Sequence, residues 1–186
     1  MKHFFKTLII ICIFISQLMI NSFHSQASDN DIFTSVGIST MVDEITEDQA
    51  KWAYAKYLGE LLQQDEIRLL SAIIWCEAGN QCEAGKQAVG IVVMNRVASD
   101  TFEDDVESVI YEKGQFRPRT DGTLNKALAM YDEGELPQEC IDAALYAYNG
   151  NTTVIYNGME IDMNPYLYFA RYWKNAKLTI QDHDFM

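Results

Sequence analysis

Apolar residues recur at intervals of three and four along most of this sequence, which is the spacing of one face of an α-helix. The pattern predicts a first helix over residues 47–64, which we expect to pack on the main domain. A second helix is expected over residues 65–79, with Asp65 as its N-cap and Gly79 as its C-cap.

A third helix is expected to begin after Asn80, because Asn80 and Glu83 have the spacing of a capping box. Its inward face is expected to consist of Ala84, Ala88, Ile91 and Val92, while Gly85 and Gly90 let another backbone come close. The same signals predict a helix that starts at Thr101 to Asp104 and stops at Gly114, followed by a loop over 115–123. Short helices are expected over about 124–131 and 138–148.

The period changes after Gly150, where Asn157 and Gly158 separate two apolar runs and predict a tight hairpin. The segments 166–173 and 177–185 are expected to supply further strands. The sequence therefore predicts an α+β protein that is mostly helical, with a small antiparallel β-sheet in its C-terminal third.

One acid stands out against this pattern. Glu77 follows Leu70, Ile73 and Ile74 at helical spacing, so its carboxyl group shares the apolar stripe of its helix. Burial and the negative end of the helix dipole both raise the pKa of a carboxyl group placed there. A carboxylic acid that stays protonated near neutral pH is suited to donate a proton to a glycosidic oxygen. The alternative is that Glu77 caps, pairs or lies at the rim of the core.

The first 27 residues have a basic start, an apolar run and a small-x-small end at Ser25 to Ala27, which is typical of a secretory signal peptide. An uncleaved membrane anchor is the alternative. Residues 28–64 are predicted to be a polar leader followed by the packing helix, and residues 65–186 the main domain. We therefore expect export from the cell.

The chain is strongly acidic, with a formal net charge of −13. Residues 1–27 contain two lysines and no acid, so the chain without them has 12 basic and 27 acidic residues. That balance argues against nucleic acid and against anionic membranes as partners. Any membrane association is expected only through an uncleaved N-terminal signal.

Three cysteines lie beyond the signal: Cys76, Cys82 and Cys140. In an exported protein, Cys76 and Cys82 are a candidate disulfide across a helix break, and three buried thiols are the alternative. No spacing of His, Cys and acidic residues matches a zinc or calcium site. We expect no metal and no cofactor.

The stretch "EAGNQCEAGKQAVGIVVMNRV" resembles the signature of the cell-wall hydrolases related to spore cortex-lytic enzymes, the SleB and CwlJ type. Its matching pieces are a Glu-Ala at residues 77–78, Gly85 with the Ala-Val at 88–89, and Asn-Arg-Val at 95–97. "GQF" at 114–116 and a terminal "IQDHDF" resemble two later motifs. The chain departs from the family pattern at Gln181, where the family tends to have Gly, and in a diverged stretch from 134 to 164.

This resemblance implies a lysozyme-like fold over residues 65–186 and cleavage of peptidoglycan between N-acetylmuramic acid and N-acetylglucosamine. It implies that Glu77 serves first as acid and then as base in a lytic transglycosylase reaction. Simple hydrolysis stays open, because Asp121, Asp182 and other acids are available to activate water. Spore cortex lysis during germination and cell-wall remodelling are both candidate settings, so we expect the protein at the cell wall or spore envelope.

Four residues are candidates for substrate binding. Gln115 and Phe116 lie in a loop after a helix, where they could contact acetamido groups and sugar faces or anchor the loop. Tyr168 and Phe169 could line the cleft or pack in the core.

Asn95, Arg96 and His183 are expected to be structural. Two other functions remain as alternatives: a Cys-His peptidoglycan peptidase with Cys76 or Cys82 as nucleophile and His183 as base, and a non-catalytic glycan-binding domain. An acid beside Cys76 disfavours a reactive thiolate. No strong apolar seam is left over, so we expect a monomer.

Overall fold

The computed structural model describes residues 47–186, and the predicted signal peptide lies outside the described residues. The chain divides into two units, with the boundary between Gln63 and Gln64. Within residues 47–186, no helix combines the length and apolarity that a membrane crossing requires.

The first described helix, α3, runs from Glu47 to Ala78 without interruption. The prediction of two helices divided at Asp65 is therefore wrong. Residues 60–70 contain neither Gly nor Pro, so the helix continues through Asp65, whose polar side chain lies exposed on its surface. The packing of residues 47–64 on the main domain stays a prediction.

Helix α4 (Glu83–Val97) follows a short turn, as expected, but its start differs from the predicted capping box. Its N-cap is Cys82, and no side chain caps it. Glu83 instead accepts a hydrogen bond from Nε2 of Gln87, 3.0 Å away. The acid still lies in the first helical turn, where the helix dipole favours negative charge.

The next helices are short: α5 (Val106–Tyr111), α6 (Pro118–Asp121), α7 (Thr123–Asp132) and α8 (Gln138–Tyr148). Helices α7 and α8 agree with their predicted positions. Helix α5 begins later than predicted, because the carboxylate of Asp105 caps it by accepting from the Ser108 amide at 2.7 Å. Helix α6 lies inside the predicted loop, and Pro118 at its first turn suits a helix start.

The C-terminal third holds two small antiparallel sheets. Strands β1 (Thr153–Tyr156) and β2 (Met159–Asp162) form the predicted hairpin, and both turn residues have positive φ, 52° at Asn157 and 76° at Gly158. Strands β3 (Phe169–Ala170), β4 (Leu178–Ile180) and β5 (His183–Phe185) form a second sheet in the order β3-β5-β4. The predicted fold class, mostly helical with a small antiparallel sheet region, is confirmed.

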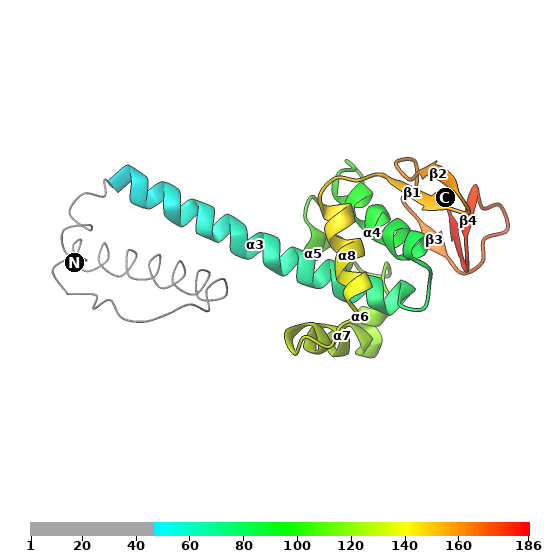
Figure 1. Ribbon diagram of the computed structural model, residues 1–186, viewed down its shortest axis with the longest axis horizontal. Helices are drawn as coiled ribbons and strands as arrows, with labels where there is room; N and C mark the ends of the chain where they lie inside the picture. The colour runs from blue at the N-terminus through cyan, green and yellow to red at the C-terminus, as the bar shows by residue number, and fades with distance from the viewer. Residues whose placement is uncertain (1–46) are drawn as a thin grey trace, which may run out of the picture. The chain divides into compact units, whose positions relative to one another are not determined.

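Helix α4 is the centre of the core (Figure 1): it packs on α8, α5 and β1. Gly90 lies at the crossing with α8. A Cβ atom at this glycine would stand 3.1 Å from the Cβ of Ala147 and 2.9 Å from Cδ1 of Ile74. The absence of a side chain at Gly90 therefore sets how closely the two helices approach.

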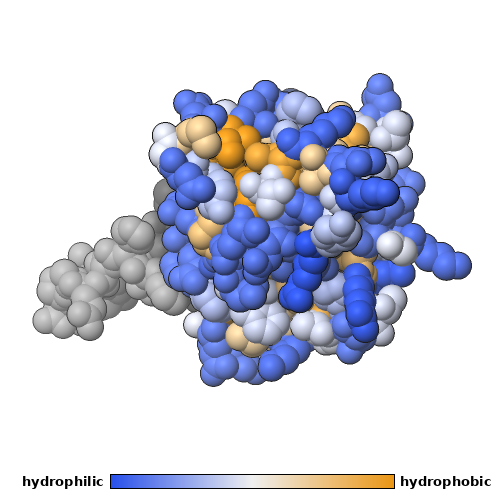
Figure 2. Space-filling model, turned by 90° about the vertical axis from the view of Figure 1, so that its right-hand side faces the viewer, coloured by the Kyte–Doolittle hydropathy of each residue, from blue (hydrophilic) through white to orange (hydrophobic). Residues whose placement is uncertain are grey.

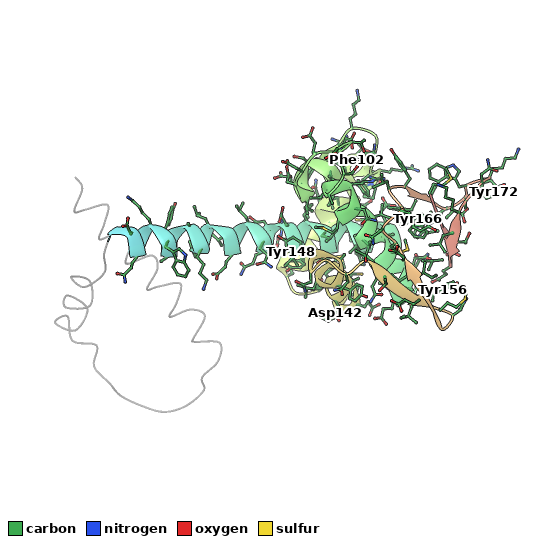
Figure 3. All side chains as sticks on the ribbon, turned by 90° about the horizontal axis from the view of Figure 1, so that it is seen from above. Phe102, Asp142, Tyr148, Tyr156, Tyr166 and Tyr172 are labelled. Carbon is green, nitrogen blue, oxygen red and sulfur yellow. The ribbon has the colours of Figure 1, made fainter. Side chains whose placement is uncertain are left out.

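Helix α8 also contacts α3. The hydroxyl of Tyr148 donates a 2.6 Å hydrogen bond to the carboxylate of Glu66, and Figure 3 shows Tyr148 beside α3. On the other side of α3, Arg68 forms two hydrogen bonds to Asp132 at the end of α7. These contacts fix the C-terminal half of α3, and with it the position of Glu77.

Candidate active site

Glu77 lies in the last turn of α3, one residue before the helix ends. Ile73 and Ile74, one turn earlier on the same stripe, are fully buried, whereas Glu77 is half-buried. Its carboxyl group therefore stands where the apolar stripe reaches the surface. Among the residues that the structure describes, that group forms no hydrogen bond or ion pair.

Burial raises the pKa of the Glu77 carboxyl group, as the sequence predicted. Two charged side chains from other segments modify this effect: Arg171, directly after β3, lowers the pKa, and Asp121, in α6, raises it. The net shift is upward. Among the described residues, Glu77 is thus a carboxyl group without a hydrogen-bond partner, biased toward its protonated form and influenced by the charges of an arginine and an aspartate.

The turn after Glu77 is held by residues from the end of the chain. Nε2 of Gln81 donates to Asp182, and Oε1 of Gln81 accepts from the Asp182 amide, both at 3.2 Å. The Cys82 amide donates to Oε1 of Gln181 at 2.5 Å. Buried Lys86 adds a bond to the Gln81 carbonyl at 2.5 Å. The α3–α4 turn and the β4–β5 turn therefore form one fixed unit.

Gln181 explains one departure from the family pattern. Its φ is +51°, in the left-handed region that glycine adopts most easily. Its amide donates to the hydroxyl of Tyr156 at 3.1 Å, which joins the two sheets. In Figure 3, Tyr156 lies on the β1–β2 hairpin. The side chain of Gln181 thus compensates for an unfavourable backbone by bonding the start of α4.

An open groove of about 340 Å³ lies at this junction. Figure 2, which faces the end of the molecule that carries the sheets, shows a largely hydrophilic surface with one apolar patch. The residues that line the groove are polar or charged. They are Asn80, Arg171, Thr179, Gln181, Asp182 and Asp184. Glu77 does not line the groove itself, but Asn80 is three residues beyond it and the charge of Arg171 lowers its pKa, so the groove lies near the acid.

Asp121 is the acid that influences Glu77 from the helical side. Its Oδ1 accepts from the Thr123 hydroxyl at 2.6 Å and from the Thr123 amide at 3.0 Å. These hydrogen bonds lower the pKa of Asp121. The pKa values of these two carboxyl groups are therefore shifted in opposite directions: that of Asp121 is lowered and that of Glu77 is raised.

Asn95 and Arg96 take structural positions, as expected, although their partners are distant carbonyls. Nδ2 of Asn95 donates to the carbonyls of Met163 and Tyr166 at 2.8 and 3.0 Å, and Nε of Arg96 donates to that of Leu167 at 2.7 Å. They fix the segment that leads into β3. The guanidinium of Arg96 is buried against three aromatic rings, with distances of 5.1 to 5.4 Å from its Cζ to the ring centroids of Phe102, Phe116 and Tyr168.

The four candidate substrate-binding residues differ in accessibility. Gln115 is half-buried, and among the described residues its side-chain amide has no partner. Tyr168 is 42% exposed and Phe169 half-buried, whereas Phe116 is only 3% exposed. The Phe116 ring packs on Phe169 with centroids 6.3 Å apart. Phe116 has little surface to offer a sugar.

His183 is buried in β5, with its ring 5.3 Å from that of Phe169, and its Nδ1 has no partner in the described part of the chain. Burial lowers the pKa of His183, and Arg171 lowers it further, while Asp182 and Asp184 act in the opposite direction. The position agrees with a structural role.

The three described cysteines are free thiols, so the candidate disulfide between Cys76 and Cys82 is not formed in this structure. Cys76 packs against the core, whereas Cys82 is exposed at the N-cap of α4, so the two side chains face different surroundings. Burial, with a further contribution from Glu77, raises the pKa of the Cys76 thiol to about 12. Burial raises the pKa of Cys140 to about 11.

Sequence reasoning missed Arg171, which it placed inside a predicted strand. Nothing local marks this arginine, because its link to Glu77 arises from the pairing of β3 with β5. Asp121 was recognised as an available acid, but its place beside Glu77 depends on α6, which was predicted to be loop.

The fold has a solved counterpart. The catalytic domain of the Bacillus cereus SleB protein superposes with a TM-score of 0.51 at 24% identity, over 66% of this chain and 89% of that domain. The catalytic domain of the germination-specific lytic transglycosylase SleB of Bacillus anthracis gives a TM-score of 0.49 at 23% identity, over 66% and 93% of the two chains. The chain therefore has the lysozyme-like fold of the B. cereus SleB catalytic domain.

Sequence comparison points the same way. The spore cortex-lytic enzyme of Halalkalibacterium halodurans is 31% identical over 78 residues, which is 42% of this chain and 24% of the length of that relative. The model of the cell wall hydrolase family matches residues 80–186, a range that begins three residues after Glu77. Since this match covers more than half of the sequence, the chain belongs to the cell wall hydrolase family.

Proposed function

We propose that this chain is a peptidoglycan-degrading glycosidase in which Glu77 is the catalytic acid and base. The cleaved bond joins N-acetylmuramic acid to N-acetylglucosamine. The observation that carries the proposal is the state of Glu77: a half-buried carboxyl group with a raised pKa, without a partner among the described residues, beside an open polar groove. Membership of the cell wall hydrolase family supports the substrate class.

In the first step, protonated Glu77 donates its proton to the glycosidic oxygen while the bond from that oxygen to C1 of the muramyl sugar breaks. Positive charge develops on the sugar ring, and the new Glu77 carboxylate stabilises it. In the second step, the primary hydroxyl of the same sugar bonds to C1 and gives its proton to Glu77. The ring closes to an anhydro sugar, and Glu77 regains the proton that it started with.

An intramolecular nucleophile has a high effective concentration, so this reaction needs no second carboxylate to activate water. Hydrolysis is the second candidate reaction, and Asp121 favours it. The Thr123 contacts hold Asp121 ionised, and its charge acts on Glu77 from the helical side. In a hydrolase, Asp121 would take a proton from water, and the product would carry a free reducing end.

The accessible aromatic and amide groups near the site suit glycan binding. We assign the free side chain of Gln115 to an acetamido group of the substrate, and Tyr168 and Phe169 to the cleft wall. Phe116 anchors the loop that carries Gln115, because its ring is buried between Phe169 and Arg96.

The chemistry of the cysteine thiols argues against the peptidase alternative. A nucleophilic cysteine must ionise, but the pKa of Cys76 is raised to about 12, and no hydrogen bond joins His183 to a described cysteine. A non-catalytic glycan-binding domain has no need to keep an acid without a partner at the end of a buried stripe.

One experiment tests these assignments together. Purified peptidoglycan is incubated with the wild type, Glu77→Gln, Asp121→Asn and Glu83→Gln, and the released fragments are analysed by mass spectrometry. Glu83→Gln is the matched control, because Glu83 is the acid of the second Glu-Ala pair and is exposed. Loss of the acid should lower the rate by about 10² to 10⁴-fold, and Glu83→Gln should keep the wild-type rate.

The products separate the candidates. Anhydro-muropeptides released by the wild type and lost in Glu77→Gln support the transglycosylase. Reducing-end products that also disappear in Asp121→Asn support the hydrolase. Cleaved peptide stems favour the peptidase, and full activity of Glu77→Gln rejects Glu77 as the acid. Binding of the glycan without any release by the wild type favours the glycan-binding domain.

We further propose that residues 1–27 direct export, that residues 28–64 connect the signal to the catalytic domain, and that the enzyme acts as a monomer at the cell wall or spore envelope. The similarity to spore cortex-lytic enzymes supports that location. Mass spectrometry of the protein recovered from the culture medium or spores would test cleavage after Ala27.

A further inference from the structure

We propose that Arg171 binds a carboxylate of the substrate in the groove beside Glu77, and so makes the enzyme select muramyl glycans over neutral ones. This inference rests on the proposed glycosidase function. It adds a specificity-determining residue that lies outside the matching sequence motifs and comes from the segment directly after β3.

Arg171 is the basic residue of the groove. Its side chain is exposed, and among the described residues it forms no hydrogen bond or ion pair. In contrast, Arg68 is paired with Asp132 and Arg96 is enclosed by aromatic rings. A guanidinium group with all its donors free is matched to a carboxylate, which it can bind through two parallel hydrogen bonds.

The backbone that carries Arg171 is held by contacts on both sides. Ala170, the residue before it, pairs with Asp184 across the β3–β5 ladder. Two residues after it, the Trp173 amide donates to Oδ2 of Asp184 at 2.7 Å. The backbone on both sides of Arg171 is therefore fixed on one aspartate, so a ligand has to order only the side chain and not the segment that carries it.

Two acids also line the groove, and their contacts decide whether an anion can enter. Both oxygens of Asp184 are used, Oδ2 by Trp173 and Oδ1 by the Thr179 hydroxyl at 2.6 Å. Asp182 uses Oδ2 for Gln81, and its Oδ1 has no partner among the described residues. Asp184 stays ionised, because the hydrogen bonds from Thr179 and Trp173 lower its pKa, so both aspartates oppose a bound carboxylate. Removing the charge of Asp182, whose side chain is held by fewer contacts, should therefore tighten binding.

Arg171 also connects binding to the acid. Its positive charge lowers the pKa of Glu77, against the effects of burial and of Asp121. A carboxylate bound to Arg171 neutralises that charge, so the pKa of Glu77 rises when the substrate is in place. The proton needed for bond cleavage is therefore held most firmly in the enzyme–substrate complex.

The carboxylate has two sources in peptidoglycan: the lactyl group of a peptide-free muramyl sugar, and the stem peptide. Three soluble probes distinguish them: a peptide-free muramyl oligosaccharide, the same oligosaccharide with its stem peptides, and a chito-oligosaccharide of equal length, which has no carboxylate. Binding is measured by calorimetry on the full chain with Glu77→Gln as background, so that no probe is cleaved.

Arg171→Gln in this background should weaken binding of at least one muramyl probe about tenfold and leave the chito-oligosaccharide unchanged, since a charged hydrogen-bond pair is typically worth that factor. The muramyl probe that responds identifies the carboxylate. Arg171→Lys should recover part of the affinity. Lys174→Gln, which removes a positive charge from an exposed residue outside the groove, should change nothing, and Asp182→Asn should tighten the same probe.

Equal loss of affinity for all three probes, or no loss for either muramyl probe, overturns the inference. The pH–rate profile gives an independent readout in the chain that retains Glu77: Arg171→Gln should extend activity to higher pH, because the acid keeps its proton longer. Failure of the proposed glycosidase function is distinguishable, because it shows as absence of cleavage by the wild type, whereas this inference is decided by binding.

Discussion

In the proposed mechanism, the proton of Glu77 that serves catalysis also affects the stability of the fold. The pKa of Glu77 is higher in the folded chain than in the unfolded chain, so the folded state binds the proton more tightly. The stabilisation that results is fully present below the unfolded-state pKa and is lost as the pH rises through the folded-state pKa. At neutral pH the ionisation of Glu77 therefore costs stability, a common property of residues that are placed for chemistry.

We predict that Glu77→Gln raises the melting temperature at about pH 7 and that the gain shrinks toward about pH 4, where a free glutamate is half protonated. The amide cannot ionise, so it avoids the penalty of a buried charge. Thermal unfolding followed by circular dichroism over this pH range measures the effect. A gain that stays constant with pH would contradict the assigned protonation of Glu77.

Gln181 offers a second test at the scale of one residue. Gln181→Gly removes the hydrogen bond to the Cys82 amide but relieves a backbone with φ +51°, whereas Gln181→Ala removes the bond and keeps the strain. We predict that the alanine variant is less stable than the glycine variant by about 1 kcal/mol. Urea denaturation of both variants measures the difference, and the reverse order would show that strain at Gln181 is negligible.

At the scale of elements, the α4–α8 crossing limits what the core tolerates. We predict that Gly90→Ala destabilises the chain by about 1 to 3 kcal/mol, because the new methyl group meets Ile74 and Ala147 at distances that require movement. Gly59→Ala is the control: this glycine also lies inside a helix, but a Cβ there meets no described atom within 4 Å.

Calorimetric unfolding of the two variants separates packing from helix propensity. Alanine favours a helix over glycine by about 1 kcal/mol, so Gly59→Ala should stabilise. Stabilisation of Gly90→Ala to the same extent would show that α4 and α8 can move apart without cost.

The positions of helices and of the hairpin could be predicted from the sequence where the determining residues lie within the element itself. Helix α8 has the predicted bounds, and the hairpin at Asn157 and Gly158 follows from a turn that needs two positive φ values. The start of α5 was not predictable, because Asp104 and Asp105 are equally good caps in sequence. Only the tertiary position of Val106 in the core selects Asp105.

The candidate site could be predicted only in part, for the same reason. Helical phase identified Glu77, since its signal is the apolar stripe of its own helix. Arg171 and Asp121 come from segments 94 and 44 residues away in the sequence, as their numbers show. No local pattern encodes such a meeting, because it depends on how β3 pairs with β5 and on the short helix α6.

At the scale of the whole molecule, net charge influences how the chain would meet the proposed substrate. The chain carries a formal charge of −13, and cell-wall glycans with free carboxylates are also anionic. Long-range repulsion slows their encounter, and salt screens that repulsion over a distance of about 10 Å at 0.1 M ionic strength. Contacts within the groove are closer than this and are screened less.

We therefore predict that raising the ionic strength from about 0.01 to 0.1 M increases the rate on intact wall material under conditions where association limits the rate. Turbidity loss of a suspension of purified walls measures it. A chito-oligosaccharide, which is neutral, should bind equally well at both salt concentrations. A rate that falls with salt would indicate a wall-binding surface that net charge does not reveal.

The contact of Gln81 with Asp182 has a consequence for the time at which the enzyme becomes active. Its two partners are 101 residues apart, so the turn after Glu77 cannot take its final position until residues 181–186 have been synthesised and have added β5 to its sheet. A ribosome that stalls earlier releases a chain with its acid in place but its groove unformed. We therefore expect truncated chains of the proposed glycosidase to be inactive.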